Sequence, residues 1–502
     1  MANEWYFGDL KVTDLTGTAY YHGHKAKEIW YQGKRIWVSN PNIDTIITVK
    51  LNTVSELQYV IGGSITSYPI GGANEYEADN PIRISWGDGE EDKLSIHQSG
   101  ILAQGFYKVH YFKAPGTYEI RIRVGKGCRW SFGGAASIFG TEVNTARFVR
   151  SEPYSAESQH LPNVISAYID KTVMSLGSRL FSENPEMDKI EFEQGRELTF
   201  SFGSHVFAES GLKAFDLMAI DGVVNASEYL FGDCRELADV ALNDDFNIRT
   251  SIDPATWEYY TSAPIPNCCF QNCESLKTVA LPKNFVVNNQ RTLQRQIGTD
   301  WLDGSGVERI VCNSSDKLLT RDGVLYSIGV SGLVLEQIPP KYPDELVIKG
   351  DVVSVVPQVV AGMNSKGAFY KSPVETLTIE PWEKNSGVNA YWIGHMPNLV
   401  NVEYGANSIS EKSPYSIQFL DCPELRKIWV RKTCAKIPII TAQYTNTGRT
   451  PFAALEGKNV TIYLEESRDY YIAQLRPADQ PYWERYMDDT FNIVYEQTTK
   501  PW

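Results

Sequence analysis

The sequence of 502 residues lacks the features that mark several large classes of protein. Eight cysteines are too few for a disulfide-dense scaffold, and seven histidines leave few candidates for a hydrolytic triad. There is no run of about 18 apolar residues, so we expect no membrane insertion. The first residues, MANEWYFGDLKV, contain no basic segment followed by an apolar one, so we expect no signal peptide.

Basic clusters are also missing. The chain has 61 acidic and 47 basic side chains, and its net charge is −14. Binding to phosphate backbones or to anionic lipid surfaces needs concentrated positive charge, so nucleic acid is excluded as a partner and attachment to anionic lipid is disfavoured.

Sequence motifs of catalysis are absent as well. We find no Walker loop, dinucleotide fingerprint, G-x-S-x-G elbow or H-E-x-x-H helix. We therefore predict that the protein is not an enzyme, with no catalytic residues, no cofactor and no metal. A glycan hydrolase needs only two carboxylates, so a cell-envelope glycan hydrolase stays open as an alternative.

What the sequence does contain is a repeat. FGDCRELADVAL, FQNCESLKTVAL and FLDCPELRKIWV all read F-x-x-C-x-x-L-x-x-(V/I)-x-(L/V). Looser copies are FSENPEMDKIEF and IGHMPNLVNVEY, and a form one residue shorter appears as FAESGLKAFDL, LDGSGVERIVC and FYKSPVETLTI. The eight copies begin at Phe181, Phe207, Phe231, Phe270, Leu302, Phe369, Ile393 and Phe419.

The spacing within a copy predicts a tight turn followed by a short strand, because its last apolar residues alternate with a period of two. One copy is too small to bury its own apolar face, so the copies must stack into a solenoid. Each buried apolar side chain contributes about 1.5–3 kcal/mol to that stacking. Together with an aromatic content of 12%, this predicts a mainly β fold.

The cysteines Cys234, Cys273 and Cys422 occupy the fourth position of three copies. Other copies place Ser210, Asn184 or Met396 there, which favours a small buried packing residue. A zinc site would need a second close pair of ligands, and the group Cys268, Cys269 and Cys273 has none nearby. Disulfides between adjacent coils are the other alternative.

This repeat resembles the BspA-type leucine-rich repeat family over roughly residues 160–495. KLLTRDGVLYSIGVSGLVLEQIPP, residues 317–340, resembles that family's hairpin insert. Residues 459–494 resemble its C-terminal end, in which a strand and a short amphipathic helix cover the last coil. The resemblance implies an irregular solenoid over 126–458 and a strand–helix cap over 459–502.

Residues 41–125 contain a second pattern. PIRISWGDGEEDK and VHYFKAPGTYEIRIRV each alternate apolar and polar residues around a turn signal. They resemble the polycystic-kidney-disease (PKD) type of Ig-like β-sandwich. The acidic residues at the tip could hold calcium or could simply be a charged hairpin tip. The matching residues are Trp86, Gly87, Asp88, Gly89, His110, Phe112, Gly116 and Tyr118.

Residues 1–40 are expected to form a separate docking arm. EIWYQGKRIWV, residues 28–38, predicts a β-hairpin and resembles the N-terminal hairpins of phage tail proteins. His22 and His24 could share one strand face and bind a metal in a three-fold assembly, or they could be exposed histidines beside a glycine.

The candidate ligand-binding residues are aromatic. Trp257, Tyr259 and Tyr260 cluster in a long insertion between two copies, and Trp382 and Trp392 bound a second stretch. Exposed aromatic rings with polar atoms suit sugar stacking or protein contacts, although these could equally pack against the solenoid.

The resemblances together imply a non-enzymatic bacteriophage virion protein of the tail, baseplate or another exposed structure. It would be assembled in the host cytoplasm, contact other virion proteins through the arm, and bind a host surface glycan or protein through the solenoid. A homo-oligomer, preferably a trimer, is expected. The alternative is a bacterial BspA-like cell-surface adhesin.

Overall fold

The computed structural model describes most of the chain between residues 44 and 502. In residues 1–43, 148–150 and 157–159 it describes only the backbone of short strands. The described residues are 44–67, 82–94, 104–124, 128–133, 160–194, 199–247 apart from 219, 221, 223 and 245, 268–282, 301–312, 318–355 apart from 330 and 331, 368–381 apart from 370, 393–406, 419–434, 437 and 452–502.

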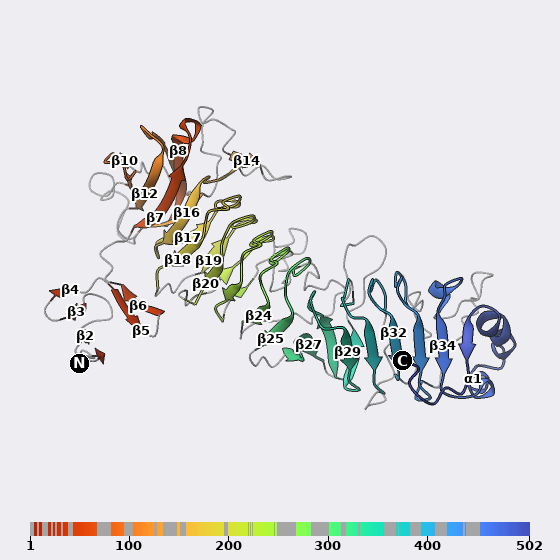
Figure 1. Ribbon diagram of the computed structural model, residues 1–502. Helices are drawn as coiled ribbons and strands as arrows, with labels where there is room; N and C mark the ends of the chain where they lie inside the picture. The colour runs from red at the N-terminus through yellow and green to blue at the C-terminus, as the bar shows by residue number, and fades with distance from the viewer. Residues whose placement is uncertain are drawn as a thin grey trace.

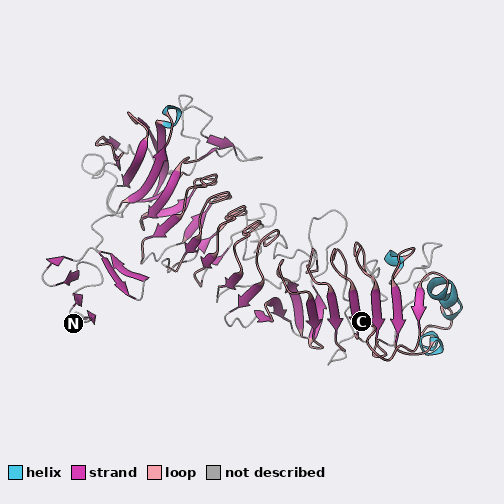
Figure 2. Ribbon diagram, in the orientation of Figure 1, coloured by secondary structure: helices cyan, strands magenta, loops and turns pink. Residues whose placement is uncertain are grey.

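The fold is mainly β, as predicted, and its strands follow one another along an extended, curved array (Figures 1 and 2). Near the N-terminus, short strands form two small antiparallel sheets, and one of these sheets is a two-stranded pair within residues 28–38. The strands are β1 (Trp5–Phe7), β2 (Leu10–Val12), β3 (Ala19–Tyr21), β4 (His24–Lys25), β5 (Glu28–Tyr31) and β6 (Lys34–Val38).

Two sheets face each other in residues 44–133. Alternate side chains of β7 (Thr45–Leu51) are buried, because one face of the strand packs on the core while the other meets solvent. Trp86 and Trp130 are fully buried between the sheets. One sheet has the order β10 (Glu91–Leu94), β9 (Ile82–Ser85), β12 (Gly116–Arg123), β7, and the other β11 (Gln104–Tyr111), β8 (Gln58–Ser67), β13 (Arg129–Phe132).

Both sheets of this sandwich continue into the solenoid. β7 pairs antiparallel with β16 (Val164–Ile169), and β13 pairs in parallel with β17 (Val173–Leu176). A single apolar core accordingly extends from the sandwich through the first coils, as far as Leu325. The boundary expected between residues 125 and 126 lies outside the described residues, and the core extends across it. The sandwich therefore covers the first coil, which would otherwise expose its apolar interior.

The first part of the solenoid has strands on two sides of this core. One series continues from β16, and the other continues in parallel from β17. The first series is β18 (Lys189–Phe192), β20 (Ala214–Asp216), β22 (Asp239–Ala241), β24 (Thr278–Leu281) and β25 (Arg309–Cys312), and the second is β19 (Phe200–Phe202), β21 (Val224–Asn225) and β23 (Phe246–Asn247).

The hairpin insert lies where it was expected and separates two apolar cores. β26 (Leu318–Arg321), β27 (Val324–Ile328) and β28 (Leu333–Gln337) form an antiparallel meander, and β30 (Val352–Val355) pairs with β28 in parallel. The second cluster of buried residues begins within the insert, at Val324, and runs to Met487.

The last coils form a six-stranded parallel sheet followed by a helical cap. Ser467 caps helix α1 (Arg468–Ala473) by accepting a hydrogen bond from the Tyr470 amide. Two further helical turns follow, η6 (Gln480–Tyr482) and η7 (Glu484–Asp488). The sheet has the order β29 (Glu345–Ile348), β31 (Thr376–Ile379), β32 (Asn401–Tyr404), β33 (Lys427–Val430), β34 (Thr461–Leu464), β35 (Asn492–Val494).

All eight sequence copies end in a strand, as predicted, and all share one unpredicted backbone feature. The third residue of each copy has a positive φ, between 52° and 71°. This left-handed residue turns the chain sharply between the first and the fourth residue of the copy, which are both buried. Only one copy places glycine there, so residue type gave no signal. The eight residues are Glu183, Glu209, Asp233, Asn272, Gly304, Lys371, His395 and Asp421.

Candidate interaction surface

The aromatic candidates from the sequence lie outside the described residues. Trp257, Tyr259 and Tyr260 fall between 248 and 267, and Trp382 and Trp392 fall between 382 and 392. His22 also lies outside, and only the backbone of His24, in β4, is described. The proposed sugar, protein and metal contacts of these residues stay predictions.

The first residue of every copy is buried, and four of them form a ring stack. The ring centroids of Phe181 and Phe207 are 5.9 Å apart, those of Phe207 and Phe231 5.7 Å, and those of Phe231 and Phe270 5.5 Å, all within 11° of parallel. Trp301 ends the stack edge-on, 6.2 Å from Phe270. This ladder joins one coil to the next and contributes both apolar burial and aromatic contacts.

The fourth residue of every copy is also buried, whatever its type. Cys234 donates a hydrogen bond from Sγ to the Phe207 carbonyl oxygen at 2.9 Å, and Cys273 does the same to Phe231 at 3.2 Å. Each thiol thus bonds the backbone of the coil before it. Burial raises the pKa of Cys234 to about 11, and it also raises the pKa of Cys273. This geometry is what the packing interpretation of these cysteines requires.

Two of the shortened copies depend on glycine at the fifth position. A Cβ built on Gly306 would lie less than 3.0 Å from the carbonyl oxygen of Glu274, and one on Gly211 would meet Pro185 in the same way. In these two copies the backbone at the fifth position lies in direct contact with the backbone of the preceding coil. Only glycine fits at this distance.

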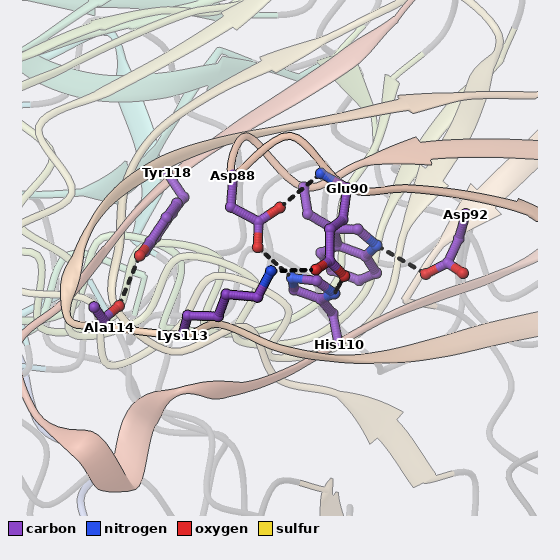
Figure 3. A network of polar contacts seen from close by, with 8 residues as sticks. Asp88, Glu90, Asp92, His110, Lys113, Ala114 and Tyr118 are labelled. Atoms are coloured by element: carbon purple, nitrogen blue, oxygen red, sulfur yellow. Dashed lines mark hydrogen bonds and ion pairs between the residues drawn. The ribbon is translucent and has the colours of Figure 1, made fainter.

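The W-G-D-G hairpin of the sandwich is tied to the opposite sheet by a polar network (Figure 3). The Asp88 carboxylate lies 2.8 Å from Nε2 of His110, and its other oxygen accepts a bond from the Glu90 amide. The His110 ring stacks on the indole of Trp86 with centroids 4.5 Å apart. Trp86 Nε1 in turn donates to Asp92 at 2.9 Å.

Electrostatics in this network favour an ionised Asp88. Burial alone would raise its pKa, but the hydrogen bonds from Glu90 and His110 and the nearby imidazole hold the pKa below its usual value. Glu90 accepts from Lys113, and Asp92 accepts from Trp86. The carboxylates considered for calcium are therefore bound to protein donors, and the described residues hold no group of three metal-ligating side chains.

A buried carboxylate lies where the sandwich meets the solenoid. Asp170 follows β16 and is 1% exposed. It accepts hydrogen bonds from the Thr45 hydroxyl at 2.6 Å and from the Thr172 amide at 2.7 Å, so it ties β7 to the first coil. Burial raises the pKa of Asp170 despite these bonds. We assign this contact to the stability of the junction.

An aromatic and charged patch lies on the outer face of the last sheet. The outward-facing residues of β33 alternate with its buried ones and include Trp429, which is only 3% exposed. The Arg431 guanidinium lies 4.3 Å from the Trp429 ring centroid and forms ion pairs with Glu403 at 2.8 Å and with Glu465 at 3.0 Å. We call Lys427, Trp429, Arg431, Glu403 and Glu465 the Trp429 patch.

Sequence reasoning missed this patch, although a signal was present. In KIWV the aromatic residue stands between Ile428 and Val430, where alternation places it outside the core. At the equivalent strand position the preceding coils carry Glu403 and Thr378. Tryptophan is enriched in contact surfaces, so its place in an outward-facing row was the signal.

Comparison with known families identifies the repeat. Residues 158–253 and 249–296 match the family described as BspA type leucine rich repeat region (6 copies). This part of the chain is a BspA-type leucine-rich repeat region. The later copies, from Leu302 onwards, lie beyond the matched residues, and in the structure they have the same turn and the same strand as the matched ones.

Comparison with solved structures gives a further similarity. The crystal structure of a leucine-rich repeat protein from Bacteroides ovatus is similar over 73% of this chain and 95% of that chain, with 13% identity and a TM-score of 0.29. Curated protein sequences gave no match. Within the described residues, no helix combines the length and the apolar character needed to cross a bilayer.

Proposed function

We propose that the protein is a non-enzymatic recognition protein whose solenoid contacts a partner on a cell surface. The observation that carries this proposal is that each copy uses different residues for the core and for its outer surface. The first and fourth residues are buried in the core, while alternate strand residues face outwards in register with those of the next coil. Such rows form a continuous surface that can be varied without disturbing the fold.

Placement on a bacteriophage particle is the finer form of this proposal. It is supported by the resemblance of residues 28–38 to tail-protein hairpins and by the antiparallel pairing of β5 with β6. In this arrangement the N-terminal strands would dock to other virion proteins and the solenoid would point towards the host. Several copies on one particle would add their affinities.

A bacterial surface adhesin is equally compatible with the BspA-type repeat region, which suggests surface recognition in either setting. Mass spectrometry of purified particles and of bacterial surface fractions separates the two. The virion proposal expects the chain in particles at a fixed ratio to the major tail proteins. Its absence from particles and presence in the surface fraction would reject that placement in favour of the adhesin.

The non-enzymatic assignment has its own test. Purified protein is applied to gels that contain host cell-wall glycan, with a lysozyme as the positive control. We expect no clearing around the protein. Clearing at its position would support the glycan hydrolase alternative, and the substitution of paired carboxylates would then locate the site.

A further inference from the structure

The last residues of the chain turn back over the solenoid. The Tyr495 hydroxyl bonds to Trp483 and Asp488 in the cap, and Glu496 then takes a positive φ of 58°. The chain reverses at that residue, so its end lies beside β32 rather than beside α1 (Figure 1). We call residues 497–502, with the sequence QTTKPW, the strap.

The strap lies on the Trp429 patch and is held there mainly by its backbone carbonyl groups. The Gln497 amide donates to the Leu464 carbonyl oxygen at 2.9 Å, and the Gln497 carbonyl oxygen accepts from Trp429 Nε1 at 3.0 Å. Further along, the Pro501 carbonyl oxygen accepts from Lys427 Nζ at 2.9 Å. The patch thus holds the backbone of the strap with donors placed on β33.

Two side chains of the strap meet complementary groups on the sheet. Lys500 Nζ lies 3.6 Å from the Glu403 carboxylate, and the Trp502 ring meets the Trp429 ring edge-on at 6.5 Å. Glu403 is mostly covered and already faces Arg431, so it offers a second cation a partly desolvated partner. This chemistry selects a basic residue followed two positions later by an aromatic one.

The strap occupies the patch imperfectly. Thr498, Thr499 and Lys500 are exposed. The hydrogen bond between the strap backbone and the sheet backbone comes from the amide of Gln497, the first residue of the strap. The Nε1 of Trp502 is buried and has no hydrogen-bond acceptor among the described residues. An unpaired buried donor costs about 1–3 kcal/mol, so a peptide that satisfied it would bind better than the strap does.

We propose that the Trp429 patch is a docking site for a peptide segment of a partner protein that carries a basic residue and an indole spaced like Lys500 and Trp502. The strap covers the site until such a peptide displaces it. This inference builds on the recognition role proposed above by naming one site and the chemistry of its partner.

The test compares three full-length chains with one labelled peptide. The probe is fluorescein-labelled YEQTTKPW, the sequence of residues 495–502, and a second probe, YEQTTEPA, lacks both selecting side chains. The chains are the unaltered protein, a strap-weakened Lys500→Glu, Trp502→Ala variant, and Lys458→Glu, which changes an exposed lysine outside the strap. Binding is followed by fluorescence anisotropy.

We expect the strap-weakened chain to bind the first probe at least tenfold more tightly than the other two chains. The reason is that the intact strap competes at the high effective concentration of an attached ligand, on the order of millimolar. Adding Glu403→Gln to the weakened chain should lower its affinity several-fold, because it removes the ion pair with the lysine of the probe. The second probe should bind none of the chains.

Several results would overturn the proposal. Equal binding to all three chains, or no binding to the weakened chain, would mean that the patch is not a peptide site. Hydrogen exchange of 495–502 as slow in the weakened chain as in β33 and β34 would show the strap to be a fixed part of the fold. Dimers of the weakened chain that exclude the probe would replace the partner by a second copy.

These outcomes are separate from those of the particle and cell-fraction experiments. If the chain is found in virions or on cells but its Trp429 patch binds no probe, the proposed recognition role stands and the proposed peptide site is rejected. If the probe binds but the chain is absent from both fractions, the peptide site stands and the proposed recognition role on a particle or cell is rejected.

Discussion

Replacing Phe270 by alanine tests whether the stacked interior holds the solenoid together. The side chain is fully buried, and its ring contacts Phe231 at 5.5 Å and Trp301 at 6.2 Å. Truncating a buried phenylalanine costs about 3–5 kcal/mol, and each aromatic pair that the truncation breaks accounts for about 0.5–1.5 kcal/mol within that range. With two ring partners, we expect the free energy of unfolding to fall by about 4–5 kcal/mol.

The destabilisation should be local, because a solenoid coil depends mainly on its immediate neighbours. Phe419→Ala is the matched variant in the second core, where the ring stacks on Phe452 at 6.1 Å. Hydrogen exchange with mass spectrometry reads each region separately, which a single melting temperature of a long repeat protein does not. At about 1.4 kcal/mol for each factor of ten, Phe270→Ala should speed exchange in β22, β24 and β25 about a thousandfold.

In the Phe270→Ala chain, β33 and β34 should keep their protection, and Phe419→Ala should give the opposite pattern. Equal decreases in both regions for either variant would refute the nearest-neighbour picture. A destabilisation under about 1 kcal/mol in β24 would refute the claim that the ring ladder supplies much of the stability.

Three further substitutions test other parts of the fold. Gly306→Ala should destabilise the adjacent coils by about 1–3 kcal/mol in urea unfolding, because its Cβ would meet a backbone carbonyl oxygen. The control is Gly116→Ala, which should cost less because its Cβ would meet only the Tyr118 side chain, at 3.3 Å. Equal costs for the two variants would contradict the close-approach argument. Cys273→Ser should cost less than about 2 kcal/mol and leave the fold intact, since other copies hold serine in that position; unfolding of the chain would support a thiol-specific role instead. Asp88→Asn should reduce the acid sensitivity of the sandwich, measured by near-ultraviolet circular dichroism. Because the folded pKa of Asp88 is lowered, its stabilisation is present above about pH 4 and disappears as pH falls towards the folded pKa, so a variant with unchanged acid sensitivity would rule out the bond to His110 as a source of stability.

The repeat interior was predictable because its signal is periodic. Eight copies place an apolar residue first and a small or unbranched residue fourth, and stacking follows from the need to bury both. The cysteines fitted this interpretation because Ser210 and Ser305 hold the same position. The hairpin insert carried its own turn signal at Asp322 and Gly323, and both residues have positive φ.

The fusion of sandwich and solenoid was not predictable in the same way. It depends on β7 pairing with β16, strands more than a hundred residues apart in the chain. Alternation shows that a strand has a buried face, but it does not say which strand lies at its open edge. The chain reversal at Glu496 was also not predictable from the sequence, because the residue with positive φ is a glutamate and not a glycine.

The two-residue period of the strands separates the residues that make the fold from those available for binding. Outward-facing ion pairs link the coils, such as Lys213 with Glu236 at 3.6 Å and Lys277 with Glu308 at 3.3 Å, but each partner is more than half exposed. Such pairs contribute about 0–1 kcal/mol, so stability resides in the interior ladder and the outer rows can change freely. Trp429 departs from this rule, since it faces outwards and is nevertheless covered. The core does not need Trp429, and the strap that covers it leaves a buried indole N–H of Trp502 without an acceptor. A tryptophan in this position is what a binding site for a partner peptide requires.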